Sequence, residues 1–568
     1  MHSMTVPLSM RRALTHLGLA LLVTWTIVPR FGRHLLGHGD VDIWNHAWGA
    51  WWWWENLSVG QIPWRTRLLQ WSDGGVLWFI DPVLAAIGAP IVFLFGPVIA
   101  FNLVLVGYVA FASWAIGRFA KSLGASQSAQ WVASCGYIGS AWLSCELHNG
   151  ITEAVNIGPV ALALAWTEDA ARKNTGQTWA RAGLGVGLAT LASPYLGLGT
   201  GIAALVRGLP RLRRAWIGGL VAIAVSAPPT LALRAQLRAP DAIVKHPEEM
   251  NIQLALHNAV DPRTFFQPFG FRSVDLSTEG FEHSMYLGWI ILGLAVLALK
   301  KSRSCTPSES TIPARSIVLW LGGAVLCLVV SLGPYLFWNG EWASLPNGAR
   351  FRLPWWALQQ IAPGLAITHP LRLAVPALAI LCALAAVGLP QRFGHRQIAI
   401  IAILILGEGL ILSGAPWPIA TADAQVPTVY QRIDDESNPM EWGILDLPSD
   451  AGETMGTSRY LFWQTSHGRP IPYGPDARAS TNALLHRPAF RALARHSRRR
   501  ADESARLNLD STGEGGTDPR QLLADGIRWI VVHPEIDPDA ANLSIQELES
   551  SLGPGEDIDG HVLWDLNP

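Results

Sequence analysis

Long apolar segments separated by short polar turns fill the first 414 residues of the chain, and this pattern predicts a bundle of membrane-crossing helices. A helix that spans a bilayer needs about 20 predominantly apolar residues. We expect about eleven spans, near residues 13–29, 98–117, 130–147, 152–170, 182–192, 195–206, 215–233, 284–300, 315–337, 373–390 and 397–413.

Two apolar regions of the chain contain residues that interrupt a helix. The apolar stretch 83–97 is short and ends in Gly96-Pro97, so it is expected to dip into the membrane without crossing it. Ser193-Pro194-Tyr195 interrupts residues 182–206, which are therefore expected to form a pair of short helices.

The chain changes character at about residue 415, where Pro, Asp, Ser and Arg become common and no run is long enough to span a bilayer. Apolar runs that include Ile and Val and end at a proline are typical of buried strands. Strands are predicted in "EWGILDLP" (441–448), "IRWIVVHP" (527–534) and "HVLWDL" (561–566), and a basic amphipathic helix in "RPAFRALARHSRRR" (487–500). The fold class expected is an all-α polytopic membrane domain, residues 1–414, followed by an α/β domain, residues 415–568.

Basic residues set the expected orientation. The short connections on one side of the predicted bundle hold 17 Lys and Arg, whereas the long loops 30–80, 234–283 and 337–372 hold 12 over about twice the length. The positive-inside rule then places the N-terminus in the cytoplasm and the long loops and the α/β domain outside the cell membrane. Because no small-residue cleavage site follows the first apolar segment, that segment is expected to be an uncleaved span.

The amino-acid composition agrees with a membrane protein and limits the kinds of molecule that the protein is expected to bind. Half of the residues are hydrophobic and only 15% are charged, whereas soluble domains carry about a quarter charged residues. The net charge of −1 favours no nucleic-acid partner. The five cysteines all precede the α/β domain, and they suggest neither a disulfide framework nor a Cys-type zinc site.

The first outer loop holds the leading chemical candidates, in "GDVDIWNHAW". Asp40 and Asp42 lie about ten residues beyond the first span, where an acid could act as a general base on a sugar hydroxyl or hold a cation. The alternative is an ordinary acidic loop. The tryptophans that follow recur at helical spacing and predict an amphipathic helix lying in the membrane interface: Trp44, Trp48, Trp51 and Trp52.

A second acidic set follows the third predicted span, in "CELHNGITEA". It comprises Glu146, His148 and Glu153, which form either a substrate-binding group or a polar turn between two helices. Their spacing matches no recognised metal motif.

Further candidates are spread over the later outer loops and spans. Lys245 and His246 lie in a loop for which an ordinary solvated loop is the favoured interpretation and substrate binding the alternative. His369 and Arg372 begin a span, where an arginine can clamp a phosphate or serve as an interfacial anchor. Glu408 lies inside the last span, as a functional acid or as a partner in a helix–helix hydrogen bond.

The order of these features resembles that of the GT-C glycosyltransferases, a superfamily of polytopic enzymes. The resemblance covers nearly the whole chain and rests on arrangement more than on a rigid motif. It is carried by "GDVDIWNHAW", "IDPVLAAIGAPIVFLFGPVIAFNLVLV", "GRFAKSLGAS", "LHNG", "THPLRLAVPALAILCALAAVGL", "QTSHGRPIPYG" and "GIRWIVVH".

The resemblance implies transfer of a sugar from a polyprenyl-phosphate carrier to an envelope acceptor on the outer face, with inversion. An acid in the first outer loop acts as the base, a role that maps onto Asp40 or Asp42, with Asp42 slightly favoured because it is nearer the tryptophan helix. Cationic side chains would stabilise the leaving phosphate, and the candidates are Arg372, Lys245 and the Arg350/Arg352 pair. No cofactor is expected, and a divalent cation stays an alternative.

Two other classes of function remain open. A transporter or flippase for lipid-linked saccharides would share the spans and the intramembrane Glu408, although the sequence shows no inverted repeat. A non-catalytic membrane protein for envelope assembly would share the topology without the chemistry.

Overall fold

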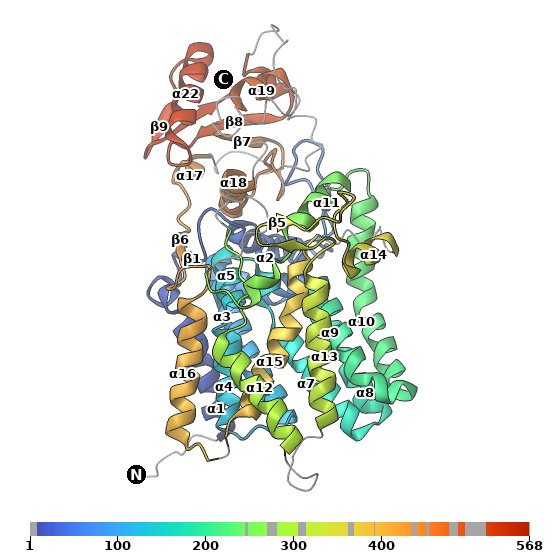
Figure 1. The fold of residues 1–568 in the computed structure, drawn as a ribbon. Helices are drawn as coiled ribbons and strands as arrows, with labels where there is room; N and C mark the ends of the chain where they lie inside the picture. Colours follow the sequence, from blue (N-terminus) through green and yellow to red (C-terminus); the bar gives the residue numbers. More distant parts are fainter. Residues whose placement is uncertain are drawn as a thin grey trace, which may run out of the picture.

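The computed structural model describes residues 8–244, 248–269, 281–304, 314–361, 368–390, 392–433, 440–449, 454–475, 487–494 and 518–566. A bundle of long helices fills the lower part of the molecule, and a small sheet with its own helices lies above one end of the bundle (Figure 1). The candidate chemistry gathers between these two parts.

The bundle consists of helices whose bounds follow the apolar pattern. They are α1 (Leu8–Val23), α3 (Pro82–Ser122), α4 (Ala129–Ile138), α7 (Gly158–Lys173), α8 (Gly176–Ala192), α9 (Pro194–Gly208), α10 (Leu212–Arg238), α12 (Trp289–Ser304), α13 (Ala314–Ser331), α15 (Val375–Gly388) and α16 (His395–Ile411). Each of the eleven predicted ranges overlaps at least one helix of the structure.

Four stretches of the described chain are helical, long and apolar enough to cross a membrane: Pro82–Ser122, Pro194–Arg238, Ala314–Ser331 and Pro370–Gly388. They indicate a multi-pass membrane protein. The figure of about eleven crossings stays a prediction.

Both breaks predicted from the sequence lie where the chain changes direction. Within α3, Gly96 has φ 79° and ψ 169°, which is non-helical, so residues 82–95 form a separate arm. Ser193 has an extended backbone and separates α8 from α9. A glycine serves at the first position because L side chains rarely adopt that φ.

The predicted span 130–147 is not one continuous helix, because α4 ends at Ile138 and the chain restarts as α5 (Ala141–Asn149). The Ser140 hydroxyl accepts a hydrogen bond from the Leu143 N–H and so caps α5. Gly150, with a left-handed φ of 65°, ends α5 and turns the chain into α6 (Thr152–Val155). Alone, neither α5 nor α6 is long enough to cross a bilayer.

The tryptophan segment forms α2 (Ile43–Ser58), as its spacing predicted. The four tryptophans do not lie in the membrane interface, however, because each is at least 93% buried inside the protein. They pack between α3 and α18 (Thr454–His467), and the Trp48 indole N–H donates to the Gln464 side chain at 2.8 Å. The C-terminal region therefore covers the face that we expected the membrane to cover.

The region above the bundle contains the sheet β7-β8-β10-β9, in which β7 and β8 are parallel and the other neighbours antiparallel. The three predicted strands are confirmed as β7 (Gly443–Leu447), β8 (Ile527–Val532) and β10 (His561–Asp565), and β9 (Glu556–Ile558) completes the sheet. Four more helices belong to this region: α17 (Val429–Ile433), α19 (Pro488–Ala494), α21 (Gln521–Ala524) and α22 (Pro538–Leu552). Of the predicted basic helix, α19 is described and residues 495–500 lie outside the described chain.

Short elements fill the junction between the two parts. β1 (His34–Leu36) pairs with β6 (Thr421–Asp423), which joins the loop after α1 to the segment that leaves α16. The others are β2 (Arg65–Thr66), β3 (Gly75–Val76), α11 (Glu248–His257), β4 (Phe337–Trp338), β5 (Glu341–Trp342) and α14 (Pro354–Ile361).

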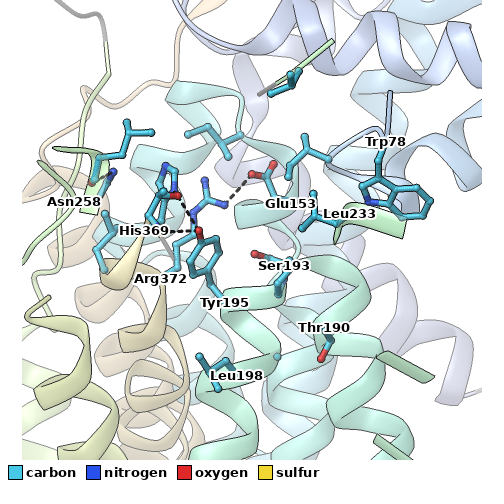
Figure 2. A pocket seen from close by; sticks show the side chains of 18 of the residues that line it. Trp78, Glu153, Thr190, Ser193, Tyr195, Leu198, Leu233, Asn258, His369 and Arg372 are labelled. Atoms are coloured by element: carbon cyan, nitrogen blue, oxygen red, sulfur yellow. Dashed lines mark hydrogen bonds and ion pairs between the residues drawn. The ribbon is translucent and has the colours of Figure 1, made fainter. Parts of the chain in front are cut away.

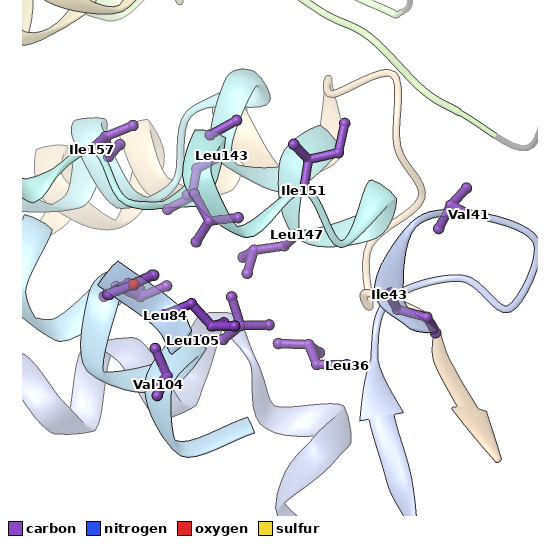
Figure 3. Close-up of a cluster of buried hydrophobic side chains, with 14 of the residues drawn as sticks. Leu36, Val41, Ile43, Leu84, Val104, Leu105, Leu143, Leu147, Ile151 and Ile157 are labelled. Carbon is purple, nitrogen blue, oxygen red and sulfur yellow. The ribbon is translucent and has the colours of Figure 1, made fainter. Parts of the chain in front are cut away.

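An apolar cluster holds the turn between α5 and α6 in place. Leu147 and Ile151 from this turn lie over Leu84 and Leu105 of α3, with Ile43 of α2 close by (Figure 3). Close packing of this kind leaves few alternative side-chain positions. The polar residues carried by α5 and α6 are consequently fixed relative to the first outer loop.

Candidate functional site

A cavity of about 970 Å³ lies between the ends of the bundle helices and the segment that joins α1 to α3. Polar residues from segments far apart in the chain line one part of it: Asp42, His46, Glu146, Glu153, Tyr195, His257, His283, His369 and Arg372. Apolar residues of α9 and α10 line another part. The cavity thus offers a charged compartment joined to an apolar one.

The central contact in the charged compartment is an ion pair between Arg372 and Glu153 (Figure 2). The Nη1 of Arg372 donates to the Oε1 of Glu153 at 2.8 Å, and the two side chains are only 7% and 5% exposed. A guanidinium has five N–H donors, so this bond leaves others for a ligand.

Tyr195 and the residues before Arg372 form a support beside the ion pair. The Tyr195 hydroxyl accepts a 2.9 Å hydrogen bond from the Thr368 N–H and lies 2.8 Å from the Thr368 hydroxyl, which is 2.7 Å from the Nδ1 of His369. The Arg372 guanidinium lies 5.6 Å from the centre of the Tyr195 ring. The ring face attracts the cation and orients its plane.

A chain of polar groups leads away from the other oxygen of Glu153. Its Oε2 is 3.6 Å from the Nε2 of His46, whose Nδ1 is 2.8 Å from the Thr152 hydroxyl. That hydroxyl donates to Asp81 at 2.7 Å, so its oxygen accepts from a protonated Nδ1. Burial lowers the pKa of His46, and Glu153 beside it acts in the opposite direction.

Asp81 ends this chain and also begins a helix. One carboxylate oxygen accepts the Leu84 N–H at 2.8 Å, which caps α3 directly before Pro82. Burial raises the pKa of Asp81 to about 7. The cap therefore connects the arm at the start of α3 to the site.

The two aspartates of the first outer loop lie in different surroundings. Asp42 is partly buried, precedes the first residue of α2 and lines the cavity, with its Oδ1 3.5 Å from the Asn45 amide nitrogen. Asp40 does not line the cavity; its side chain is 66% exposed and lies 4.0 Å from His38. Of the two, only Asp42 can reach a ligand inside the cavity.

Glu146 lies on α5 at the cavity wall and is 2% exposed. None of the described residues forms a hydrogen bond to its Oε2. Burial raises the pKa of Glu146 to about 8, with Arg372 opposing the shift and the charges of Glu153 and Asp42 adding to it. Glu146 is therefore mostly protonated at neutral pH and can donate a hydrogen bond to a ligand.

The apolar compartment opens toward the side of the bundle. Leu198 and Leu205 of α9 line the cavity and are 40% and 57% exposed, so they face both the cavity and the outside of the bundle. Leu233 of α10 lies on the opposite wall, above which Trp78 is seen (Figure 2). An apolar chain can enter here from the membrane.

The structure thus brings five sequence-predicted residues to one cavity: Asp42, Glu146, Glu153, His369 and Arg372. Four other residues predicted from the sequence lie outside this cavity. Asp40 is described above, and His148 is buried with its ring stacked on His38. The guanidinium of Arg350 lies over Trp342 and that of Arg352 over Trp356, 5.1 and 4.2 Å from the ring centres. Lys245 and His246 lie outside the described residues.

Sequence reasoning missed His46, Tyr195 and Asp81 as members of the site. His46 follows Asp42 by four residues, which places both on one helical face, and this spacing could have identified it. Asp81 precedes Pro82, a typical cap position. Nothing in the sequence near Tyr195 indicates its contact with Thr368.

Glu408, the acid predicted inside the last span, has a structural partner. Its carboxylate accepts hydrogen bonds from the Tyr286 hydroxyl at 2.6 Å and from the backbone N–H of Trp289 at 2.7 Å. These contacts cap the start of α12. Of the two interpretations given for Glu408, the hydrogen bond between helices is therefore the one that the structure supports. It does not line the cavity.

Single side chains of the cavity could each bind a cation, but among the described residues that line it no three such ligand atoms lie close enough to share one. Among the described residues, the one group of three or more His, Cys, Asp or Glu with atoms close enough to share an ion lies in the C-terminal region.

Comparisons with known proteins identify the fold. No protein-family model and no curated protein matches the sequence. A variant of the arabinofuranosyltransferase AftD from Mycobacteria is similar in structure, with a TM-score of 0.51 and 15% identity over 96% of this chain and 39% of that one. ArnT from Cupriavidus metallidurans, in the apo state, gives 0.50 and 13% over 98% of both chains. This chain spans about two fifths of the length of AftD. At the level of the fold, this chain is therefore similar to AftD and to ArnT.

Proposed function

We propose that this protein is an integral membrane glycosyltransferase that moves a sugar from a polyprenyl-phosphate carrier to an envelope acceptor on the outer face of the membrane. The observation that carries the proposal is the cavity, in which a buried arginine and three acids adjoin an apolar compartment open to the side of the bundle. A lipid-borne phosphosugar has this same division into a charged head and an apolar tail. The fold shared with an arabinofuranosyltransferase supports the same class of reaction.

In this proposal the carrier enters between α9 and α10, and its phosphate reaches Arg372. The bond between the anomeric carbon and the phosphate oxygen breaks, and the phosphate leaves with the bonding electron pair. A guanidinium beside that oxygen stabilises the charge that develops there. The ion pair with Glu153 and the Tyr195 ring keep the guanidinium in one orientation before the lipid arrives.

Asp42 is the proposed base. It takes the proton of the acceptor hydroxyl while the hydroxyl oxygen attacks the anomeric carbon from the side opposite the phosphate, which inverts the configuration. General-base catalysis of this kind contributes about 10²–10⁴-fold to a rate. Glu146, protonated at neutral pH, is suited to donate a hydrogen bond to the sugar or the phosphate.

The proposed arrangement has residues 1–414 as the membrane domain and residues 415–568 as an α/β domain on the outer side. The N-terminus lies in the cytoplasm of a bacterial cell, and the cell membrane holds about eleven spans. The α/β domain, which packs on α2 through α18, would border the path of the acceptor.

Mass spectrometry of lipid-linked sugars and envelope glycans tests this function. The strains to compare are the wild type, a deletion, and the deletion carrying Asp42→Asn or Asp40→Asn at matched protein levels. Loss of one sugar from a glycan with accumulation of its lipid donor, in the deletion and in Asp42→Asn but not in Asp40→Asn, is expected. If Asp42→Asn restores the wild-type glycan, Asp42 is not the base. If the deletion leaves both glycans and lipid donors unchanged, the protein is no glycosyltransferase.

A further inference from the structure

A second polar cluster lies in the C-terminal sheet, apart from the cavity described above. It consists of His533, Glu535 and His561, whose ligand atoms all lie within 4.8 Å of one another. His533 directly follows β8 and His561 begins β10. These strands are antiparallel with Val532 opposite Val562, so the next pair in register is His533 and His561. The sheet itself brings the two imidazoles together.

The distances fit one shared metal ion. The Nδ1 atoms of His533 and His561 are 3.1 Å apart, and the Glu535 oxygens lie 3.9 and 3.5 Å from them. Two nitrogen ligands about 2.0–2.1 Å from a tetrahedral zinc lie roughly 3.4 Å from each other. The nitrogen pair is about 0.3 Å closer than this separation, and the two Glu535 distances, which belong to Oε1 and Oε2 respectively, exceed it by about 0.5 and 0.1 Å.

The hydrogen bonds of His533 fix the tautomer that a metal requires. Its Nε2 lies 3.1 Å from the Oδ1 of Asp446, and an acceptor carboxylate there places the proton on Nε2. The Nδ1 of a neutral ring then presents its lone pair toward His561 and Glu535. A carboxylate that orients a histidine in this way is the usual outer partner of a metal-bound imidazole.

Charge balance points in the same direction. Asp446 and His533 are fully buried, and the Asp446 Oδ1 accepts from the Tyr430 hydroxyl at 2.7 Å and lies 3.1 Å from the His533 Nε2. Its Oδ2 has no hydrogen-bond partner within the described chain. A divalent cation held by two neutral imidazoles and Glu535 would balance the charges of both carboxylates.

We infer that His533, Glu535 and His561 form a binding site for a divalent transition metal of the zinc type, oriented by Asp446. Two imidazoles and one carboxylate are ligands that zinc accepts, and three protein ligands leave a fourth position for water. Glu535 is 42% exposed, so that position opens to solvent. The ion would join the end of β8 to the start of β10 and stabilise the sheet. This inference is independent of the proposed glycosyl transfer.

The test uses the full chain in detergent, purified with a tag free of histidine and stripped with a chelator. Zinc is then returned, the protein is dialysed, and bound zinc per chain is measured by mass spectrometry together with the melting temperature. The variants are Glu535→Ala and His561→Gln, both at side chains with solvent access, and the control is Glu549→Ala, an exposed acid on α22.

Wild type and control should bind one more zinc per chain than either variant, and zinc should raise their melting temperature but not that of the variants. Cobalt(II) adds a readout of the ligands themselves, because the visible spectrum of bound cobalt should change when His561 is replaced. Equal zinc content in wild type and both variants, or no zinc retained by the wild type, would overturn the inference. Zinc bound elsewhere, for example by histidines of the cavity, would be present equally in all four proteins. It would therefore not change the difference in zinc content between them.

Discussion

The guanidinium of Arg372 and the carboxylate of Glu153 meet at 2.8 Å in a place where both side chains are more than nine-tenths buried. Two charges so far from water are tolerated because each neutralises the other. The pair joins the 3-10 turn Pro370–Ala374, which directly precedes α15, to α6 at the cavity wall. It therefore has a structural role as well as the proposed one toward a phosphate.

Removing one partner of this pair should destabilise the protein. Glu153→Ala leaves the Arg372 charge buried and uncompensated, which costs about 3–5 kcal/mol in comparable pairs. The melting temperature in detergent should fall clearly. The double variant Glu153→Gln/Arg372→Met, which buries no charge, should recover part of the loss. A double variant less stable than Glu153→Ala would show that the pair does not behave as a unit.

Glu146 predicts a dependence of stability on pH. Burial raises its pKa to about 8 from an ordinary 4.5, so the folded chain keeps a proton that the unfolded chain releases between these values. The free energy of unfolding should therefore fall as pH rises through this window, by at most about 1.4 kcal/mol per pH unit for one group. Asp81, with a pKa raised to about 7, adds to the fall at lower pH.

Glu146→Gln should remove the part of this fall that Glu146 causes. Melting temperatures measured in detergent between about pH 5 and pH 8 should decline less steeply for this variant than for the wild type. Glu549→Gln, an exposed acid, is the control and should match the wild type. Parallel curves for Glu146→Gln and the wild type would mean that Glu146 is ionised throughout.

The apolar compartment predicts that one glycine position controls lipid binding. Gly201 of α9 lines the cavity, and a Cβ there would meet only Val186, at an ordinary 3.8 Å. Gly201→Leu should fold and occupy part of the compartment. We expect its affinity for undecaprenyl phosphate, measured by native mass spectrometry, to fall at least about tenfold, which is 1.4 kcal/mol.

The matched control is Gly219→Leu on α10, which does not line the cavity and where a Cβ meets nothing within 4 Å. It should bind the lipid as the wild type does. Equal affinity in both glycine variants would place the lipid outside this compartment, and equal weakening would point to a general effect on the bundle.

The sequence predicted local features well and contacts between distant segments poorly. Strand β7 could be predicted because an apolar run of the right length ends in a proline, and α2 because its tryptophans recur at helical spacing. The partner of those tryptophans could not, since α18 follows about 400 residues later and no local pattern encodes it.

The same limit applies to the candidate site. Glu146 and Glu153 could be identified because acids beside apolar runs are rare. Arg350 and Arg352 carry the same local signal as Arg372, a cation in an outer loop, yet they stack on tryptophans. Only its contact with Glu153 separates Arg372 from them, and that contact joins side chains 219 positions apart in the chain.

Gln464 predicts how the C-terminal region is held on the bundle. Its side chain is fully buried, its oxygen accepts the Trp48 indole N–H at 2.8 Å, and its nitrogen donates to the carbonyl oxygens of Leu68 and Arg469 at 2.7 and 2.8 Å. One amide thus joins α18 to α2 and to the first outer loop. Gln464→Glu preserves the shape of the side chain. It replaces the amide nitrogen, which donates to the two carbonyl oxygens, with a carboxylate oxygen, which can only accept.

Gln464→Glu should therefore lower the melting temperature in detergent, because each unsatisfied buried carbonyl costs about 1–3 kcal/mol. Part of the loss should return at low pH, since a protonated carboxyl regains one donor. Gln464→Leu loses all three hydrogen bonds without gaining a charge, so its deficit should not depend on pH. If the two variants lose the same stability at every pH, the amide donors of Gln464 do not hold the C-terminal region on α2.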